Sequence, residues 1–254
     1  MLRPRIIPCL LIQGGGLVKT VKFKDPKYIG DPLNAVRIFN EKEVDELIVL
    51  DIDATRLGNS PNENLIENLA AECRMPLCYG GGINNIDQIE RLISLGVEKV
   101  AVSSAIIETP ALISEAAARV GSQSIVSIID IKNTGLFKRP EVVIHNAMQR
   151  TGLDPIEFAC NLEQLGVGEI VINSVDQDGT MLGYDFELID SFKKVVSVPL
   201  TALGGAGSFN DLRQLVQEYP VIGAAAGSLF VFKGKYRAVL INYPNRSDRD
   251  SLVS

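Results

Sequence analysis

Aspartate side chains follow short apolar runs at three places in the chain. Asp51 and Asp53 come after DELIVL, Asp130 after SIVSII, and Asp176 and Asp178 lie in SVDQDGT after GEIVIN. A carboxylate at the carboxyl end of a buried strand is partly desolvated and can exchange protons with a substrate. Asp130 is the candidate catalytic residue, because it is the first charge after its run. Capping of a loop explains Asp51 and Asp53 equally well, and Asp178 is expected to fix a phosphate-binding turn.

Glycine-rich turns follow several of the apolar runs and form two similar sets. Glycine lets backbone N–H groups converge on an anion, and the last two loops of a barrel frequently hold a phosphate. Tight turns need the same glycines, but their duplication favours two phosphate-binding cradles. The first cradle is expected at Gly81, Gly82, Ser103 and Ser104, and the second at Asp178, Gly179, Gly204, Gly205, Gly227 and Ser228.

Four charged residues begin apolar runs: Arg5, Glu46, Lys99 and Glu169. If the runs are parallel strands, two positive and two negative charges meet at the floor, the amino-terminal end of the sheet. Buried charges must be paired, and a ring of alternating sign pairs them. From the residues alone, this floor ring is interpreted as a stabilising device, since that face of a barrel usually serves stability.

The elements that position these residues repeat eight times: a β-branched apolar run, a polar loop and a helical pattern. Helical patterns that start at Asp31, Thr109 and Asp154 have a capping residue followed by proline. Eight such units predict an α/β fold, a single-domain (β/α)8 TIM barrel over residues 1–243, followed by a polar tail, 244–254, that frays. The expected strands are 5–12, 46–52, 77–79, 99–103, 124–131, 169–174, 199–203 and 221–225.

The two halves of the sequence resemble each other, which predicts half-barrel pseudo-symmetry. YGGGINNIDQIERLISLGVEKVAVSS, from Tyr79, aligns with LGGAGSFNDLRQLVQEYPVIGAAAGS, from Leu203. The same offset places IIPCLLIQG beside IVSIIDIKN, so that Leu11 falls opposite Asp130. One half therefore carries a carboxylate where the other carries a leucine.

Composition argues against several classes of protein. The net charge is −6 and there is no long basic run, so nucleic-acid binding is not expected. No uninterrupted apolar window of about eighteen residues exists, which argues against membrane insertion. The four cysteines lie in apolar segments without paired metal spacing, and His145 is the only histidine. We expect free thiols in a reducing cytoplasm, and neither a metal nor a cofactor.

Eight ordered motifs along the chain resemble the cyclase subunit of imidazole glycerol phosphate synthase, HisF. They are RIIPCL, DELIVLDIDA, YGGGI, GVEKVAVSSA, GSQSIVSIID, GEIVINSVDQDGTMLGYD, LTALGGAG and AAAGSLF. The resemblance implies a barrel that receives ammonia from a HisH-like glutaminase docked on its floor. It also implies that the ammonia joins a bisphosphorylated substrate, N'-phosphoribulosylformimino-aminoimidazole carboxamide ribonucleotide, and that an imidazole ring closes. Two phosphate cradles suit such a substrate.

Individual residues acquire expected roles from this resemblance. Arg5, Glu46, Lys99 and Glu169 match the charged gate at the ammonia entrance, and Lys19 matches the lysine of a mobile first loop over the active site. Asp130 matches one of two catalytic aspartates.

The sequence departs from the family pattern at two positions. Leu11 stands where the second catalytic aspartate belongs, and leucine can neither give nor take a proton. General acid–base assistance is worth about 10² to 10⁴ in rate, so cyclase activity is expected to be weak. Ser103 replaces an asparagine often found in its cradle, which is a milder change.

PRIIPCLL, the segment from LVKTVKF to LDIDA, and GSLFVFKGKYRAVLINYP resemble a particular HisF-like branch. That branch is associated with acetamidino-sugar modification in bacterial surface polysaccharides, where a HisH-like glutaminase and a separate sugar amidotransferase act with the barrel. The leading hypothesis is an ammonia-transferring synthase subunit acting on a phosphorylated small molecule. One alternative is a histidine-pathway cyclase making imidazole glycerol phosphate and aminoimidazole carboxamide ribonucleotide. Others are a non-catalytic scaffold that activates the glutaminase and another phosphosugar-binding barrel enzyme, which the charged floor disfavours.

Overall fold

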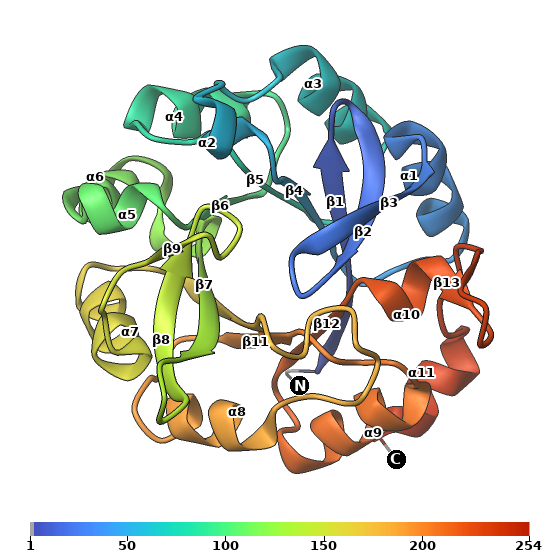
Figure 1. The fold of residues 1–254 in the computed structure, drawn as a ribbon. Helices are drawn as coiled ribbons and strands as arrows, with labels where there is room; N and C mark the ends of the chain where they lie inside the picture. The colour runs from blue at the N-terminus through green and yellow to red at the C-terminus, as the bar shows by residue number, and fades with distance from the viewer. Residues whose placement is uncertain (1–2, 254) are drawn as a thin grey trace.

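Eight parallel strands close into a barrel in the computed structural model, which describes residues 3–253 (Figure 1). The last barrel strand pairs with the first, Arg5 beside Gly223, so the sheet has no edge. This confirms the predicted (β/α)8 TIM barrel. Residues 1 and 2 of the expected domain, and Ser254 of the expected tail, lie outside the described part. The barrel strands are β1 (Arg5–Gln13), β4 (Leu47–Asp51), β5 (Leu77–Gly80), β6 (Lys99–Val102), β7 (Ile125–Thr134), β10 (Glu169–Ser174), β11 (Leu200–Leu203) and β12 (Gly223–Ala226).

Alternate residues of each barrel strand point into the barrel, as the two-residue period of a strand requires. In β1, Ile7 and Cys9 belong to the inner cluster with Leu11 packed against it, whereas Leu10 and Ile12 pack outward against the helices. Both faces are buried, which explains why the strands read as continuous apolar runs. The same period aligns two floor charges with mouth residues on their own strands: Arg5 with Leu11 on β1, and Glu169 with Asn173 on β10.

Outer helices cover the barrel, and two of the predicted caps are present. The Asp31 side chain accepts from the Asn34 amide, and Asp154 accepts from the Ile156 and Glu157 amides. The third expected cap is wrong, because Pro110 rather than Thr109 occupies the N-cap and no side chain caps that helix. The outer helices are α1 (Pro32–Glu41), α3 (Glu63–Glu72), α4 (Ile86–Ser94), α6 (Ala111–Val120), α7 (Pro155–Gln164), α8 (Phe186–Lys193), α9 (Phe209–Glu218) and α11 (Arg246–Val253).

Shorter elements lie in the loops that follow the barrel strands. They include three hairpins, β2–β3, β8–β9 and β13–β14. The segment after β1, expected to be a loop, is instead a hairpin whose strand β2 continues the sheet by pairing with β1. A second hairpin extends β7 through β8 and β9. The short elements are β2 (Gly16–Val21), β3 (Lys24–Gly30), α2 (Ala54–Leu57), α5 (Ala105–Glu108), the 3₁₀ turn Ser122–Ser124, β8 (Arg139–Ile144), β9 (Gln149–Arg150), α10 (Ser228–Val231), β13 (Phe232–Lys233) and β14 (Ala238–Val239).

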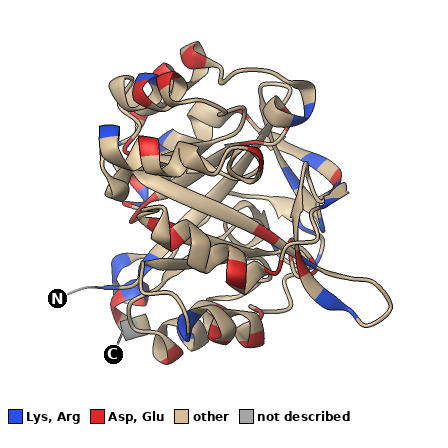
Figure 2. Ribbon diagram, turned by 90° about the vertical axis from the view of Figure 1, so that its left-hand side faces the viewer, with Lys and Arg blue, Asp and Glu red and all other residues tan. Residues whose placement is uncertain are grey.

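The polar tail does not fray, contrary to expectation. Residues Arg246–Val253 form α11, which packs beside α9. Leu252 is only 4% exposed, and Arg249 donates to the Glu43 carbonyl and to Asp45. The two chain ends lie on the same side of the barrel (Figure 2). No helix within residues 3–253 has the length and apolarity needed to cross a membrane.

Candidate functional site

The floor ring closes the amino-terminal end of the barrel with contacts that join every cation to both carboxylates. Arg5 lies 2.5 Å from Glu46 and 2.8 Å from Glu169, measured between guanidinium nitrogens and carboxylate oxygens. Lys99 Nζ lies 2.8 Å from Glu46 and 2.9 Å from Glu169. The four residues predicted from the sequence to form the floor ring are therefore in direct contact. A fifth member, Thr201, was missed: its hydroxyl donates to Glu169 at 2.6 Å.

Charge pairing in the ring outweighs the effect of burial. Burial alone would raise the pKa of Glu169, but hydrogen bonds and charge from Arg5 and Lys99 hold that pKa below its usual value. Burial would likewise lower the pKa of Lys99, yet Glu169 and Glu46 raise it. The ring is thus ionised and stabilised as a network.

A pocket opens at the other end of the barrel, where the carboxyl ends of the strands meet. Asp130, Leu11 and Lys19 line it, together with all four residues of the first cradle, Gly81, Gly82, Ser103 and Ser104. Of the second cradle, only Asp178 and Gly227 line it. Strand ends far apart in sequence therefore converge on one site.

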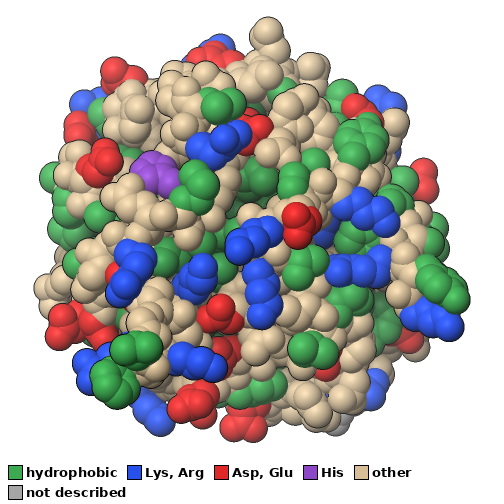
Figure 3. Space-filling view, in the orientation of Figure 1, with side chains coloured by type: hydrophobic (Ala, Val, Ile, Leu, Met, Phe, Trp, Pro, Cys, Tyr) green, Lys and Arg blue, Asp and Glu red, His purple; other side chains and the backbone are tan. Residues whose placement is uncertain are grey.

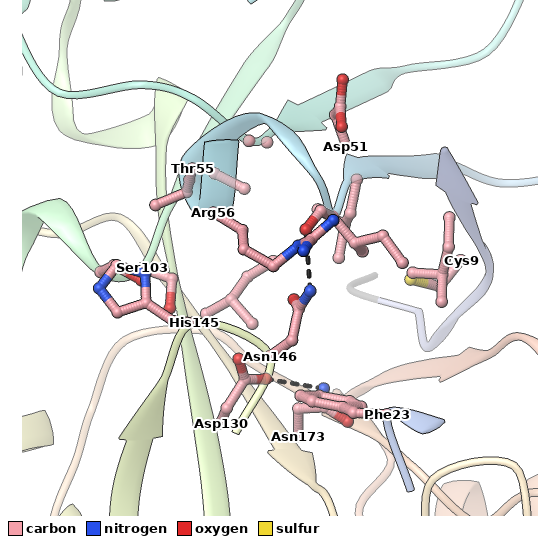
Figure 4. Close-up of a pocket in the computed structure, with 18 of the residues that line it drawn as sticks. Cys9, Phe23, Asp51, Thr55, Arg56, Ser103, Asp130, His145, Asn146 and Asn173 are labelled. Atoms are coloured by element: carbon pink, nitrogen blue, oxygen red, sulfur yellow. Dashed lines mark hydrogen bonds between the residues drawn. The ribbon is translucent and has the colours of Figure 1, made fainter. Parts of the chain in front are cut away.

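Asp130 lies deep in this pocket, with part of its surface open to it. Burial raises the pKa of Asp130 to about 7, although a hydrogen bond from Asn173 opposes the shift. Asn173 Nδ2 donates to Asp130 Oδ1 at 2.8 Å, as the dashed line in Figure 4 marks. Asn173 comes from β10, where it stands directly opposite Asp130 in the β7–β10 register. A carboxyl group with a pKa near neutrality can take up and release a proton in turn.

The other aspartates have structural partners. Asp51 accepts from the Asp53 and Ala54 amides, and burial raises its pKa. Asp53 pairs with Arg56 at 2.8 Å. Asp176 accepts from an amide of the β7–β8 hairpin at 2.8 Å. Loop capping, the alternative raised from the sequence for Asp51 and Asp53, thus accounts for their contacts. Asp51 and Asp178 also line the pocket, but Asp51 caps a loop and Asp178 pairs with Lys19, which leaves Asp130 as the pocket carboxylate with neither kind of partner.

Leu11 ends the inward row of β1 and packs against the apolar interior, where Leu50 of the neighbouring strand also lies. It lines the pocket from the strand opposite β7. The mouth therefore has a titratable group on one wall and an apolar side chain on the facing wall.

Glycine is required in both cradles by backbone geometry. Gly81 has φ +117°, and a Cβ there would approach the Asp51 carbonyl oxygen to 2.3 Å. Gly205 has φ +105°, and a Cβ would lie 1.9 Å from the Gly183 oxygen. The Gly82 amide already donates to Thr55 Oγ1 at 3.1 Å. These turns are tight, as the alternative explanation required, and the phosphate role stays a prediction.

Lys19 is not on a loop. It is 6% exposed on β2, and its ammonium lies 2.8 Å from Asp178 and donates to the Thr20 carbonyl. Asp178 therefore anchors the β2–β3 hairpin to the loop after β10, a contact that the sequence did not predict. Whether the hairpin moves over a ligand stays a prediction.

Other pocket residues escaped sequence reasoning because they come from the β8–β9 turn. His145 and Asn146 line the pocket, and both have positive φ, near 50–60°. Asn146 reaches across to donate to the Ile52 carbonyl at 2.9 Å (Figure 4). Three consecutive non-glycine residues in the left-handed region, 145–147, are a signal visible only in the backbone.

A closed eight-stranded barrel with a pocket at the carboxyl ends of its strands places the chain among the (β/α)8-barrel proteins, whose active sites lie at that end. The chain belongs to the family described as "Histidine biosynthesis protein", whose sequence model matches residues 5–237. It is 57% identical over 99% of both chains to a Leptospira interrogans protein named "Putative imidazole glycerol phosphate synthase subunit HisF". A Vibrio vulnificus protein with a similar name is 56% identical over 98% of this chain and 96% of its own. A Lactococcus lactis protein named "Imidazole glycerol phosphate synthase subunit HisF" is 39% identical over 91% of this chain and 89% of its own. The HisF-like family predicted from the motifs is confirmed.

Proposed function

We propose that this chain is the ammonia-using subunit of a two-part synthase. A HisH-like glutaminase docks on the floor, ammonia passes the ring of Arg5, Glu46, Lys99 and Glu169, and a phosphorylated substrate receives it at the mouth. The observation that carries the proposal is the pairing of a complete floor ring with an acid of near-neutral pKa, Asp130, at the opposite end of the same barrel.

The chemistry at the mouth then depends on Asp130. With a pKa near 7, its carboxyl group accepts a proton as ammonia attacks and returns it to a leaving group. Asn173 holds one carboxylate oxygen in place. A reaction that needs two carboxylates on facing walls is not served, because Leu11 occupies the second position.

The proposed substrate follows from having a carboxylate, Asp130, on one wall and a leucine, Leu11, on the facing wall. An amidine is formed by adding ammonia to one activated carbon, which does not demand the paired acid and base of ring closure. We therefore favour acetamidino-sugar formation in surface-polysaccharide biosynthesis, with a separate sugar amidotransferase as a further partner. The motif resemblance supports this branch.

A pull-down with the glutaminase, followed by glutamine hydrolysis, tests the floor. Binding of the barrel is expected to raise glutamine hydrolysis, and failure to bind any glutaminase would remove the basis of the ammonia route.

Assaying the purified barrel with ammonium and the bisphosphorylated substrate tests whether the chain has diverged from the histidine-pathway cyclase. Turnover is expected to be about 10² to 10⁴ lower than for a barrel with both carboxylates. Near-normal turnover would instead favour the histidine-pathway cyclase.

That alternative has an observation in its favour: the 39% identical Lactococcus lactis relative has the HisF name without qualification. A scaffold that only activates the glutaminase is distinguished by Asp130→Asn. Unchanged product formation by the complex carrying that variant would favour the scaffold.

A further inference from the structure

Arg237 is a half-buried cation without an ion-pair partner among residues 3–253. It lies just before β14. Lys19, which lines the mouth pocket, is by contrast neutralised by Asp178 at 2.8 Å. A half-buried guanidinium normally has a carboxylate or another anion beside it.

The contacts of Arg237 lead directly to the predicted second cradle. Its Nη2 donates to the Gly179 carbonyl at 2.9 Å and to Ser228 Oγ at 3.1 Å. Gly179 and Ser228 were both assigned to that cradle from sequence, and Ser228 is only 3% exposed. The loop after β10 and the start of α10 are therefore joined by one side chain from the β13–β14 hairpin.

One donor of the same guanidinium is buried and has no partner. Arg237 Nε is shielded from solvent and makes no hydrogen bond within the described residues. Nε and Nη2 share one edge of the planar guanidinium, an edge that can hold a phosphate or carboxylate side-on with two parallel hydrogen bonds. Gly179 and Ser228 use both hydrogens of Nη2, so a phosphate oxygen at this edge would take the place of the Ser228 hydroxyl as acceptor. An unsatisfied buried donor next to an unpaired charge indicates that an anion belongs there.

The surroundings hold the guanidinium in place and add to the positive potential. Arg237 lies 4.9 Å from the Phe232 ring centre, and Lys27 lies 5.1 Å from the same ring. Lys27 Nζ also donates to the Arg237 carbonyl at 3.0 Å. Lys and Arg side chains group around the mouth on the face seen in Figure 3. Arg237 itself has φ +51°, a strained conformation that persists only where surrounding contacts enforce it.

We propose that Arg237 is a phosphate ligand of the second cradle, gripping a phosphomonoester side-on through Nε and Nη2 beside the Ser228 hydroxyl. The inference rests on the proposed function only in taking the ligand to be one end of its phosphorylated substrate. The two cradles then differ: the first offers hydroxyls and backbone amides, whereas the second adds a guanidinium. Phosphate is favoured over carboxylate because the site also offers the glycine turns and a serine hydroxyl, which suit three acceptor oxygens.

Titration of the full-length chain with inorganic phosphate, followed through individual backbone amide signals, tests this. Gly179 and Ser228 report on the second cradle, and Gly81 and Ser104 on the first. In Arg237→Gln, the phosphate concentration that half-saturates the second cradle is expected to rise about 10- to 100-fold, as for loss of a charged hydrogen-bonding pair. The first cradle should be unchanged. Arg237→Lys, which keeps the charge over Phe232 but loses the fork, should weaken binding less.

Arg213→Gln on α9 is the matched control, since it removes an exposed arginine and should alter neither cradle. Equal phosphate affinity at the second cradle in wild type and Arg237→Gln would overturn the inference and leave the proposed function standing. Acetate competing as well as phosphate would overturn the choice of phosphate. If neither cradle responded to phosphate in the wild type, the phosphorylated substrate of the proposed function would fail too, whereas glutaminase activation would still be tested separately.

Discussion

Asp130 combines two demands that conflict in a folded protein. It lies where burial disfavours its charge, and it keeps an open face toward the pocket where a proton can be exchanged. Its contact with Asn173 shows how little compensation it receives: one hydrogen bond and no cation. Functional groups are expected to have such poorly compensated surroundings.

Replacing Asp130 by asparagine should therefore stabilise the fold at high pH. The folded pKa of about 7 lies above the ordinary 3.8, so the charge destabilises the native state above pH 7 and this cost disappears as pH falls toward 4. Asp130→Asn should gain about 1–3 kcal/mol in unfolding free energy at pH 8 and little at pH 4.5. Urea unfolding at both pH values measures this. Asp25→Asn on exposed β3 is the control, and a loss of stability in Asp130→Asn at pH 8 would contradict the prediction.

Leu11→Asp should restore a carboxylate on the wall facing Asp130. If the missing acid is what limits ring closure, turnover of the bisphosphorylated substrate with ammonium should rise by about 10² or more. The apolar packing of Leu11 against the barrel interior is lost, so a lower denaturation midpoint is expected as well. Leu11→Asn has nearly the same size but transfers no proton; equal turnover in the two variants would refute the account.

Sequence reasoning reached Asp130 but not its partner. Asp130 is visible as the first charge after an apolar run, whereas Asn173 lies 43 residues away, and only the parallel register of β7 with β10 brings them together. Arg237 was missed for a related reason. It lies in GSLFVFKGKYRAVLINYP, a segment used only for a family resemblance, and its role depends on contacts with Gly179 and Ser228 from other loops.

Among the elements, the barrel strands were predictable and the hairpins were not. Parallel strands buried on both faces give continuous apolar runs, and all eight were found with boundaries shifted by at most three residues. The hairpin strand β3 is KDPKYIG, which is polar and contains proline, so it carries no strand signal. Its conformation comes from pairing with β2, and β2 in turn pairs with β1. Helix α11 was missed likewise, since its stability comes from packing on α9 and not from a strong apolar face.

The β2–β3 hairpin should depend on Lys19. Its ammonium and the Asp178 carboxylate are both nearly buried, so Lys19→Met leaves an uncompensated negative charge. Breaking one side of a buried pair typically costs about 3–5 kcal/mol. Hydrogen exchange of amides in β2 and β3 should speed up more than that of β7. Lys22→Met, at an exposed position of the same hairpin, should change little; equal exchange rates for the two variants would argue against the anchor.

At the scale of the whole molecule, strand parity links the two ends of the barrel. Arg5 and Leu11 share the inward row of β1, Glu169 and Asn173 share that of β10, and Ser103 directly follows β6, which begins with Lys99. The floor ring draws on three strands, β1, β6 and β10, and on Glu46, the residue before β4, so its ion pairs tie both half-barrels together at one end. The mouth, at the other end, is held by loops and hairpins. The fold thus separates a floor of paired charges from an end that carries an acid and a cation without ion-pair partners, Asp130 and Arg237.

Lys99→Met tests this division at the floor. The variant leaves Glu46 and Glu169 with Arg5 as their one cation, so the pKa of Glu169 should move back toward its usual value. A carboxylate with a depressed pKa stabilises the fold above its ordinary pKa, near 4.5, and loses that contribution as pH falls through the folded pKa. Lys99→Met should therefore be less stable than the wild type at pH 7, by about 3–5 kcal/mol, with the difference shrinking near pH 3.

In the proposed complex, the same variant should lose more of its glutamine-driven product formation than of its ammonium-driven formation, because free ammonium can enter at the mouth. Lys193→Met on α8 is the surface control, and an equal fall in both activities would place the effect of Lys99 in the fold and not in the passage of ammonia.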